Sequence, residues 1–88
     1  MHFQPGQQIA YVPPHAFGDT SHPDVMFGFV TSSNHRLTFC RFWQSRSSRH
    51  LRTKCCSEPC STNSLTPYNS HPQPEVDLIL NAILRSMN

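Results

Sequence analysis

Two segments with alternating side chains, separated by a short polar turn, constrain this chain more than any other feature. In residues 25–31 and again in residues 37–43, aromatic and β-branched side chains recur at every second position. An extended strand has a period of two, so each segment places these side chains on the same face. Residues 32–35 between them are polar and suit a tight turn. The pattern therefore predicts an antiparallel β-hairpin.

The rest of the chain predicts two short strands, one long loop and one helix. The short strands are expected at 8–12 and 64–68. Residues 44–64 are poor in hydrophobic side chains and rich in Ser, Arg and Cys, so we expect a long loop with a short strand near 51–53. Over residues 74–87 the period becomes helical, which predicts an amphipathic helix. Its apolar stripe consists of Val76, Ile79, Leu80, Ile83 and Met87.

The start and the role of this helix each allow two interpretations. Pro74 suits the first helical turn, whereas a start with Ser70 as N-cap and Gln73 three residues later would form a capping box. The apolar stripe either covers the open end of the β-structure or, if it is exposed, docks a partner chain.

Length and composition favour one small, loop-rich domain over residues 1–88. With 36% hydrophobic and 14% charged residues, the chain has a thin core. It contains no apolar run near the roughly 20 residues that a membrane helix needs. The first residues lack the basic start and apolar stretch of a signal peptide. We therefore expect a cytoplasmic protein without a membrane partner, whose four cysteines are reduced or bind metal.

About half of the chain, residues 4–43, resembles a family of small uncharacterised proteins encoded by bacteriophages and metagenomic viral sequences. The resemblance rests on Pro5-Gly6-Gln7-Gln8-Ile9-Ala10-Tyr11-Val12-Pro13, His15-Ala16, Gly18-Asp19, His22-Pro23-Asp24 and Gly28-Phe29-Val30-Thr31-Ser32. It implies a mainly β fold, with a small SH3-like barrel over residues 4–68, a long RT-type loop after the first strand, and the C-terminal α-helix as an addition. It also implies a phage accessory protein in the host cell cytosol, and it implies no catalytic residues.

A cysteine cluster gives the chain a candidate metal site. Cys55, Cys56 and Cys60 lie close in sequence, and His50 and Cys40 are further potential zinc ligands. The second pair of ligands that a zinc site usually shows is missing, and adjacent cysteines ligate one ion only with a strained backbone. The cysteines depart from the pattern of the family that the chain resembles. Free loop thiols and a disulfide remain the alternatives.

Two histidines and two aspartates in the RT-type loop form a candidate partner-binding site. These residues are His15, Asp19, His22 and Asp24. If they converge, they can bind a metal or act in acid–base chemistry, because imidazole titrates near neutral pH. Alternatively, the aspartates stabilise turns through bonds to their own backbone and the histidines only pack.

A basic segment gives a candidate nucleic-acid-binding surface. It contains Arg36, Arg41, Arg46, Arg49, Arg52 and Lys54, with no acidic residue between positions 25 and 57. Cations beside the aromatic side chains Phe39, Phe42 and Trp43 suit phosphate contacts and base stacking. The alternative is that the charges are solvated in a loop and that these aromatics form the core of the hairpin.

The motifs of common enzymes do not occur in the sequence. It has no nucleophile elbow, no metalloprotease motif, and only three glycines with which to build a phosphate-binding loop. We therefore expect a non-enzymatic binding module without a cofactor. A host or phage protein is the expected partner, with nucleic acid as the alternative and a zinc-stapled structural module as a third class. The sequence does not determine the oligomeric state.

Overall fold

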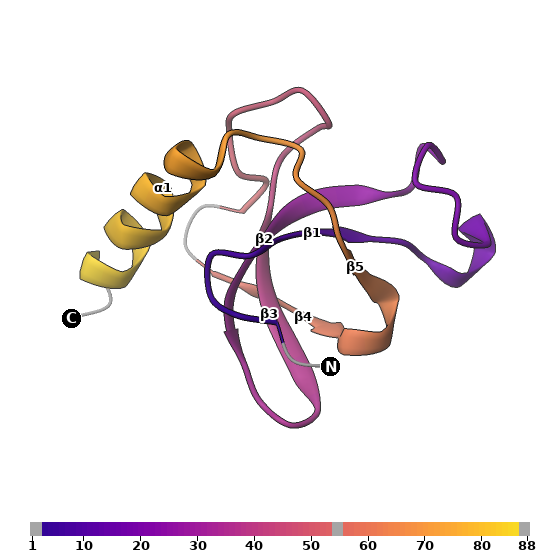
Figure 1. The fold of residues 1–88 in the computed structure, drawn as a ribbon, viewed down its shortest axis with the longest axis horizontal. Helices are drawn as coiled ribbons and strands as arrows, with labels where there is room; N and C mark the ends of the chain where they lie inside the picture. The colour runs from indigo at the N-terminus through magenta and orange to yellow at the C-terminus, as the bar shows by residue number, and fades with distance from the viewer. Residues whose placement is uncertain (1–2, 54–55, 87–88) are drawn as a thin grey trace.

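Five antiparallel strands form one sheet in the order β4-β3-β2-β1-β5 (Figure 1). The computed structural model describes residues 3–53 and 56–86. The strands are β1 (Gln8–Tyr11), β2 (Met26–Ser33), β3 (Leu37–Phe42), β4 (Glu58–Ser61) and β5 (Leu65–Pro67). The other elements are two 3-10 turns, η1 (Pro14–Ala16) and η2 (Thr62–Ser64), and the helix α1 (Gln73–Ser86). The predicted mainly β fold with a C-terminal helix is confirmed.

The predicted hairpin is formed by β2 and β3. Gly28 lies opposite Phe42 and Val30 opposite Cys40, and the register shifts by one residue after Val30. The turn is centred slightly later than expected, because Asn34 closes it: its Oδ1 accepts the backbone N–H groups of Arg36 at 2.8 Å and Leu37 at 2.9 Å. Side chain and backbone together thus fix the hairpin register.

The sheet buries apolar side chains on both of its faces. Phe27, Phe29 and Trp43 pack with Val76 and Leu80 of α1 on one face. The other face buries a second cluster, formed by Phe3, Ile9, Val30, Cys40, Phe42, Cys60 and Leu65. The two sets of alternating side chains in β2 therefore enter different clusters, as the period of two predicts. Both faces are buried, which accounts for the number of aromatic residues in so short a chain.

A polar network joins α1 to the first strand. The side chain of Gln8, which is buried, donates to the His71 carbonyl at 2.7 Å and accepts the His71 N–H at 2.9 Å. Gln73 donates to the Gly6 carbonyl at 2.7 Å. Pro74 lies in the first turn, so of the two predicted starts the later one is correct, and the Ser70 hydroxyl contacts the ring of His71 instead.

The apolar stripe of α1 covers one face of the sheet. Val76 and Leu80 are buried, and Ile79 and Ile83 pack partly buried against the same cluster. Met87, the last predicted member of the stripe, lies outside the described residues. Of the two roles considered for the stripe, covering β-structure is the one that the contacts support. Within the described part of the chain, no helix is long and apolar enough to cross a membrane.

The prediction that the long loop continues to residue 64 is wrong, because β4 forms within it. Strand β4 pairs with β3 from Leu37 opposite Ser61 to Cys40 opposite Glu58. Its central Pro59 has no N–H to donate, and it is accommodated because β4 is an edge strand. The short strand expected near 51–53 is reduced to one bridge between Trp43 and Leu51.

Candidate functional site

A loop held by short-range backbone hydrogen bonds connects β1 to β2 and carries the candidate site. This segment, residues 12–25, is called the 12–25 loop and lies at the end of the molecule opposite α1 (Figure 1). Its backbone folds through successive short-range bonds: Asp19 N–H donates to the Ala16 carbonyl at 3.0 Å, His22 N–H to Asp19 at 3.2 Å, and Val25 N–H to His22 at 3.1 Å. These bonds make the loop a chain of turns with a defined shape.

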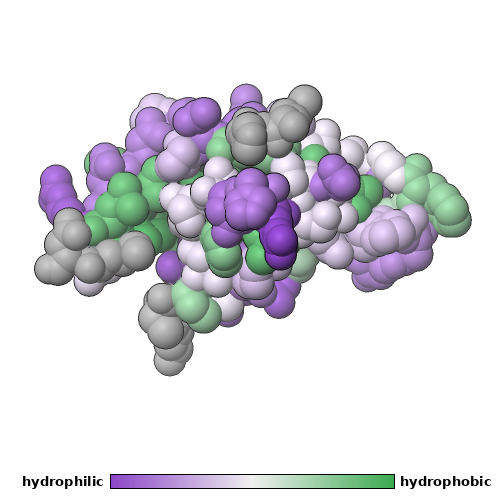
Figure 2. All heavy atoms as spheres, turned by 90° about the horizontal axis from the view of Figure 1, so that it is seen from below, coloured by the Kyte–Doolittle hydropathy of each residue, from purple (hydrophilic) through white to green (hydrophobic). Residues whose placement is uncertain are grey.

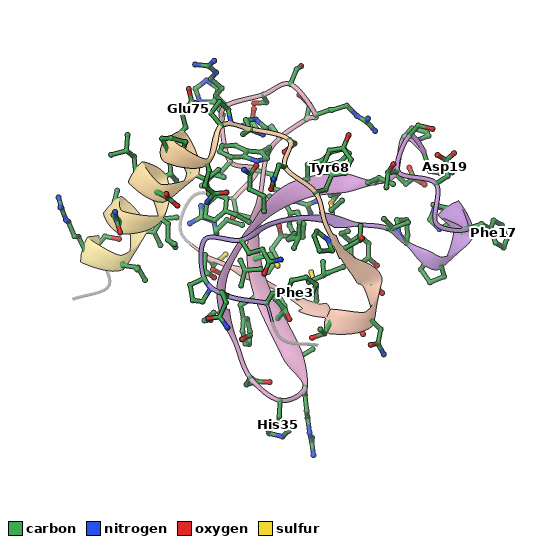
Figure 3. The ribbon with its side chains drawn as sticks, in the orientation of Figure 1. Phe3, Phe17, Asp19, His35, Tyr68 and Glu75 are labelled. Carbon is green, nitrogen blue, oxygen red and sulfur yellow. The ribbon has the colours of Figure 1, made fainter. Side chains whose placement is uncertain are left out.

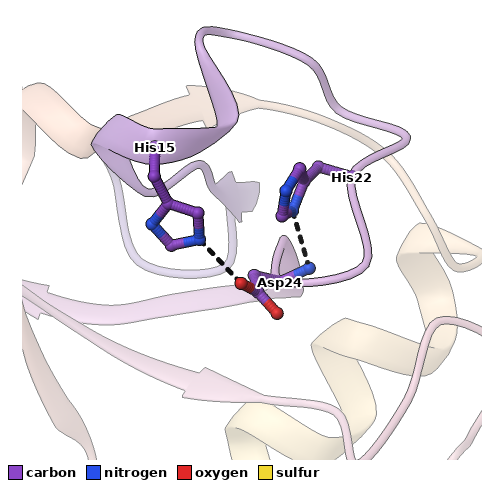
Figure 4. Close-up of side chains that lie close together, drawn as sticks. All are labelled: His15, His22 and Asp24. Carbon is purple, nitrogen blue, oxygen red and sulfur yellow. Dashed lines mark hydrogen bonds and ion pairs between the residues drawn. The ribbon is translucent and has the colours of Figure 1, made fainter.

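Three of the four predicted loop residues converge. His15 and Asp24 form a hydrogen bond with 2.6 Å between Nε2 and Oδ2, and His22 Nδ1 accepts the backbone N–H of Asp24 at 3.1 Å (Figure 4). The two imidazole rings meet edge to face at 5.2 Å between centroids. One potential ligand atom from each residue lies within 4.8 Å of the others. The group is open to solvent, since the His15 and Asp24 side chains are both more than half exposed.

Asp19 does not join this group. Its Oδ1 accepts the Ser21 hydroxyl at 2.6 Å and the Ser21 backbone N–H at 2.9 Å. These bonds stabilise the charged form, so the pKa of the Asp19 carboxyl is lowered from its ordinary value. The bond from the Ser21 hydroxyl is the larger cause, and the bond from the Ser21 amide is the next. Asp19 is therefore a turn-stabilising residue, which is the alternative role considered for it.

An exposed aromatic side chain stands at the tip of the 12–25 loop. Phe17 is 92% exposed, and its backbone lies in the left-handed region at φ 51° and ψ 41°. Figure 3 shows its ring pointing away from the rest of the molecule, beyond η1. Phe17 was not among the predicted site residues. Its one sequence signal is an aromatic residue before Gly18 in a loop that is otherwise largely polar.

The predicted basic surface is largely occupied by internal contacts. Arg41 is only 4% exposed and donates to the Thr53 carbonyl at 2.6 Å. Arg46 donates to the Thr20 carbonyl at 2.8 Å, and its guanidinium lies 4.5 Å from the centroid of the Phe27 ring. This arginine therefore braces the 12–25 loop against the sheet.

Two further arginines of the basic segment face carboxylates. Arg49 pairs with Glu75 at 3.3 Å, and Arg52 pairs with Glu58 at 3.1 Å. Arg36 lies in the hairpin turn beyond β2, and Lys54 lies outside the described residues. The structure thus distributes these side chains over several separate environments.

The aromatic residues near the basic segment belong mainly to the core. Phe42 and Trp43 are buried, and Phe39 is half-buried. The Trp43 ring stacks on His71 with 4.1 Å between centroids and contacts Phe29 at 5.7 Å. These rings contribute to folding, which is the alternative role considered for them.

The cysteines that the structure describes do not converge on a metal site. Cys56 is exposed, whereas Cys60 is buried beside Cys40 between β3 and β4. A hydrogen bond between these two thiols, together with burial, raises the pKa of Cys40 well above its usual range, and the same bond lowers the pKa of Cys60. Cys55 lies outside the described residues. Of the predicted zinc ligands, those described are divided between the core and the surface.

Two hollows flank the 12–25 loop. One, of about 330 Å³, lies between the loop and β5, where Pro14, Thr20 and Leu65 line it. The other, of about 360 Å³, lies between the loop and the segment after β3, where His22 and Arg46 are among its lining residues. The loop therefore presents a projecting aromatic tip with a concave surface on either side.

Comparison with known proteins gives no further guide to this site. No protein family, no curated protein and no solved structure matches the chain.

Proposed function

We propose that this protein is a non-enzymatic binding module that recognises a protein partner through the 12–25 loop, with Phe17 as the central contact. The observation that carries the proposal is that the Phe17 side chain is 92% exposed while its backbone lies in the left-handed region. The left-handed region costs an L-residue about 1–2 kcal/mol. Exposure of a large apolar ring adds no folding energy. A residue that is unfavourable for stability on two counts supports a role in binding.

The bonds within the 12–25 loop support the same function. Binding loses less conformational entropy when the contact surface is already ordered. The turn bonds of Asp19 and the Arg46 brace hold the loop in one shape. An aromatic anchor on an ordered support, flanked by hollows that can receive partner side chains, is typical of the residues that dominate protein interfaces.

We also propose that the sheet belongs to a small SH3-like barrel. In support, a long loop joins β1 to β2, a tight turn joins β2 to β3, and a 3-10 turn separates β4 from β5. Within the described residues, the ladder pairings run in an open order from β4 to β5. On the resemblance of residues 4–43, we propose a phage accessory protein that acts in the host cell cytosol on a host or phage protein.

The experiment that tests the binding function replaces Phe17 by glycine. Phe17→Gly removes the ring and relieves the left-handed strain, so we expect the free energy of unfolding to stay within about 1 kcal/mol of the wild type or to rise. We expect partner capture to fall about tenfold or more, because loss of an aromatic anchor costs roughly 2 kcal/mol. Immobilised variants are incubated with bacterial lysate, and retained proteins are quantified by mass spectrometry.

The matched control is Leu78→Ala on α1. Leu78 is another large apolar side chain, 71% exposed, at the end of the molecule away from the 12–25 loop. Figure 2 shows apolar side chains at both ends of the molecule, with a mainly polar surface between them. A protein captured equally by the wild type and Leu78→Ala but lost with Phe17→Gly supports the proposal. Equal capture by all three variants contradicts it, and so does a Phe17→Gly variant that unfolds.

A further inference from the structure

We propose that His15, His22 and Asp24 form a binding site for one divalent transition-metal ion on the 12–25 loop. The three residues bring one potential ligand atom each to within 4.8 Å of the others, and Figure 4 shows their side chains turned toward one another. The site is separate from Phe17 and does not depend on the proposed protein partner.

The distances between the potential ligand atoms are close to those between the ligands of a coordinated ion. With metal–ligand bonds of about 2.0–2.1 Å, ligand atoms in a tetrahedral site lie roughly 3.4 Å apart. The observed separations bracket this value, from 2.6 Å between His15 and Asp24 up to the limit of 4.8 Å. An ion therefore fits between the imidazole and the carboxylate if side-chain rotations move the two ligand atoms apart by about 1 Å. The exposure of both side chains leaves room for these rotations.

The backbone that carries the ligands is already in place. His15 lies in η1, and Asp24 lies just before β2, so the two limbs of the loop each contribute a ligand. The Val25 N–H bond to the His22 carbonyl and the Ala16 N–H bond to the Pro13 carbonyl fix the backbone beside the three ligands. The ion thus replaces contacts between side chains, while the turns of the loop stay as they are.

Two hydrogen bonds are given up when the ion binds, and His15 Nε2 must be free of its proton. The ion replaces the hydrogen bond between His15 Nε2 and Asp24, so the neutral His15 ring carries its proton on Nδ1. At His22, Nδ1 accepts the Asp24 N–H, and the ring gives up this bond as it turns one nitrogen to the ion. The bond between His15 and Asp24 is weak in net terms, because both side chains are more than half exposed. Coordination by neutral imidazole and carboxylate outweighs the two lost bonds.

The donor set selects the class of ion. Two imidazole nitrogens and one carboxylate oxygen suit zinc, cobalt, nickel, copper or ferrous iron, whereas calcium and magnesium require oxygen donors and more of them. Three protein ligands leave at least one coordination position open. Stability does not explain the group, since a polar contact as exposed as His15–Asp24 contributes little to folding.

The test measures binding of Co²⁺ and Zn²⁺ to the reduced protein without a histidine tag. Cys55→Ser and Cys56→Ser are included in every variant so that these thiols do not compete for the ion. We expect one equivalent of Co²⁺ by visible absorption, displaced by Zn²⁺. We expect His15→Gln and Asp24→Asn each to weaken binding about tenfold or more, because even the loss of an outer partner of a ligand costs roughly 10–100-fold.

The matched control is His35→Gln, which changes an exposed histidine in the hairpin turn far from the 12–25 loop (Figure 3). Metal affinity is expected to match that of the parent protein. Amide NMR spectra provide a measurement that needs no variant: Zn²⁺ should shift the signals of the 12–25 loop and leave those of the hairpin turn unchanged. The proposal is overturned by the absence of bound ion, by affinity unchanged in His15→Gln, by a thiolate-to-cobalt absorption band, or by shifts confined to other residues.

Discussion

At the scale of single residues, Gly28 shows how closely the central strands approach each other. A methyl group at this position would lie 2.1 Å from the Arg41 carbonyl oxygen and 2.9 Å from the Phe42 Cα. Both neighbours belong to the backbone of β3, which cannot move away without breaking the ladder between β2 and β3. Glycine is therefore required at position 28, because there is no room for a Cβ atom between the two strands.

We predict that Gly28→Ala lowers the free energy of unfolding by about 3 kcal/mol or more, because the added methyl overpacks two paired backbones. Gly18→Ala is the matched control. Gly18 has φ +78° and open space around it, so the strain of its backbone alone should cost about 1–2 kcal/mol. Urea denaturation measures both losses, and equal losses would contradict the steric explanation.

Residue roles in the 12–25 loop were only partly predictable from the sequence. The histidines and aspartates were identified as a set, because their spacing in one loop allows them to converge. Which members converge depends on turn geometry. Asp19 accepts hydrogen bonds from Ser21, only two residues away, whereas the side chain of His15 reaches across the loop to Asp24. The exposed state of Phe17 depends on the whole loop path, which no local pattern specifies.

At the scale of elements, the attachment of α1 depends on Gln8, a polar side chain inside the molecule. We predict that Gln8→Ala destabilises the protein by about 1–3 kcal/mol, because it leaves the His71 N–H and carbonyl without their partner. Gln4→Ala, which shortens an exposed glutamine, should stay within about 0.5 kcal/mol.

Trp43 reports the same change by fluorescence. It is the single tryptophan of the chain, stacks on His71 and shares its cluster with Val76 and Leu80. If Gln8 holds α1 and the segment before it in place, Gln8→Ala should shift the native emission to longer wavelength, and Gln4→Ala should leave it unchanged. An unshifted spectrum and unchanged stability in Gln8→Ala would show that apolar packing alone holds the helix.

Elements with a strong periodic pattern were predictable, and those without one were not. The hairpin buries alternating side chains on both faces of the sheet and α1 buries one stripe, and both spacings are present in the sequence. Strand β4 has the sequence Glu58-Pro59-Cys60-Ser61, which has little β propensity. It forms because the free edge of β3 pairs with it, and this interaction is visible only in the folded chain.

At the scale of the whole molecule, the distribution of charge bears on the nucleic-acid hypothesis. Six phosphate contacts from the basic segment would give a slope of about −5 for log affinity against log salt concentration. Arg41, Arg46, Arg49 and Arg52 have carbonyl or carboxylate partners within the molecule.

We therefore predict weak binding to random DNA or RNA, with a slope of about −2 or shallower. Fluorescence polarisation at several salt concentrations measures it. Arg36→Ala serves as a variant at the hairpin turn, outside these internal contacts, and should change the slope by about 1. A steep slope that Arg49→Ala and Arg52→Ala abolish would favour the basic segment as the site instead of the 12–25 loop.

The pairing of β1 affects the order in which the protein can fold during its synthesis. The β2–β3 hairpin is local and can form early, but β1 also pairs with β5, and Gln8 bonds to residues 63 and 65 positions later. At ribosomal rates of about 5–20 residues per second, β1 waits roughly 3–13 s for these partners. During this interval one edge of β1 is an unpaired template for other chains. The nascent protein thus passes through a stage in which a chaperone, or a neighbouring nascent chain, can compete with its own C-terminal segment for the first strand.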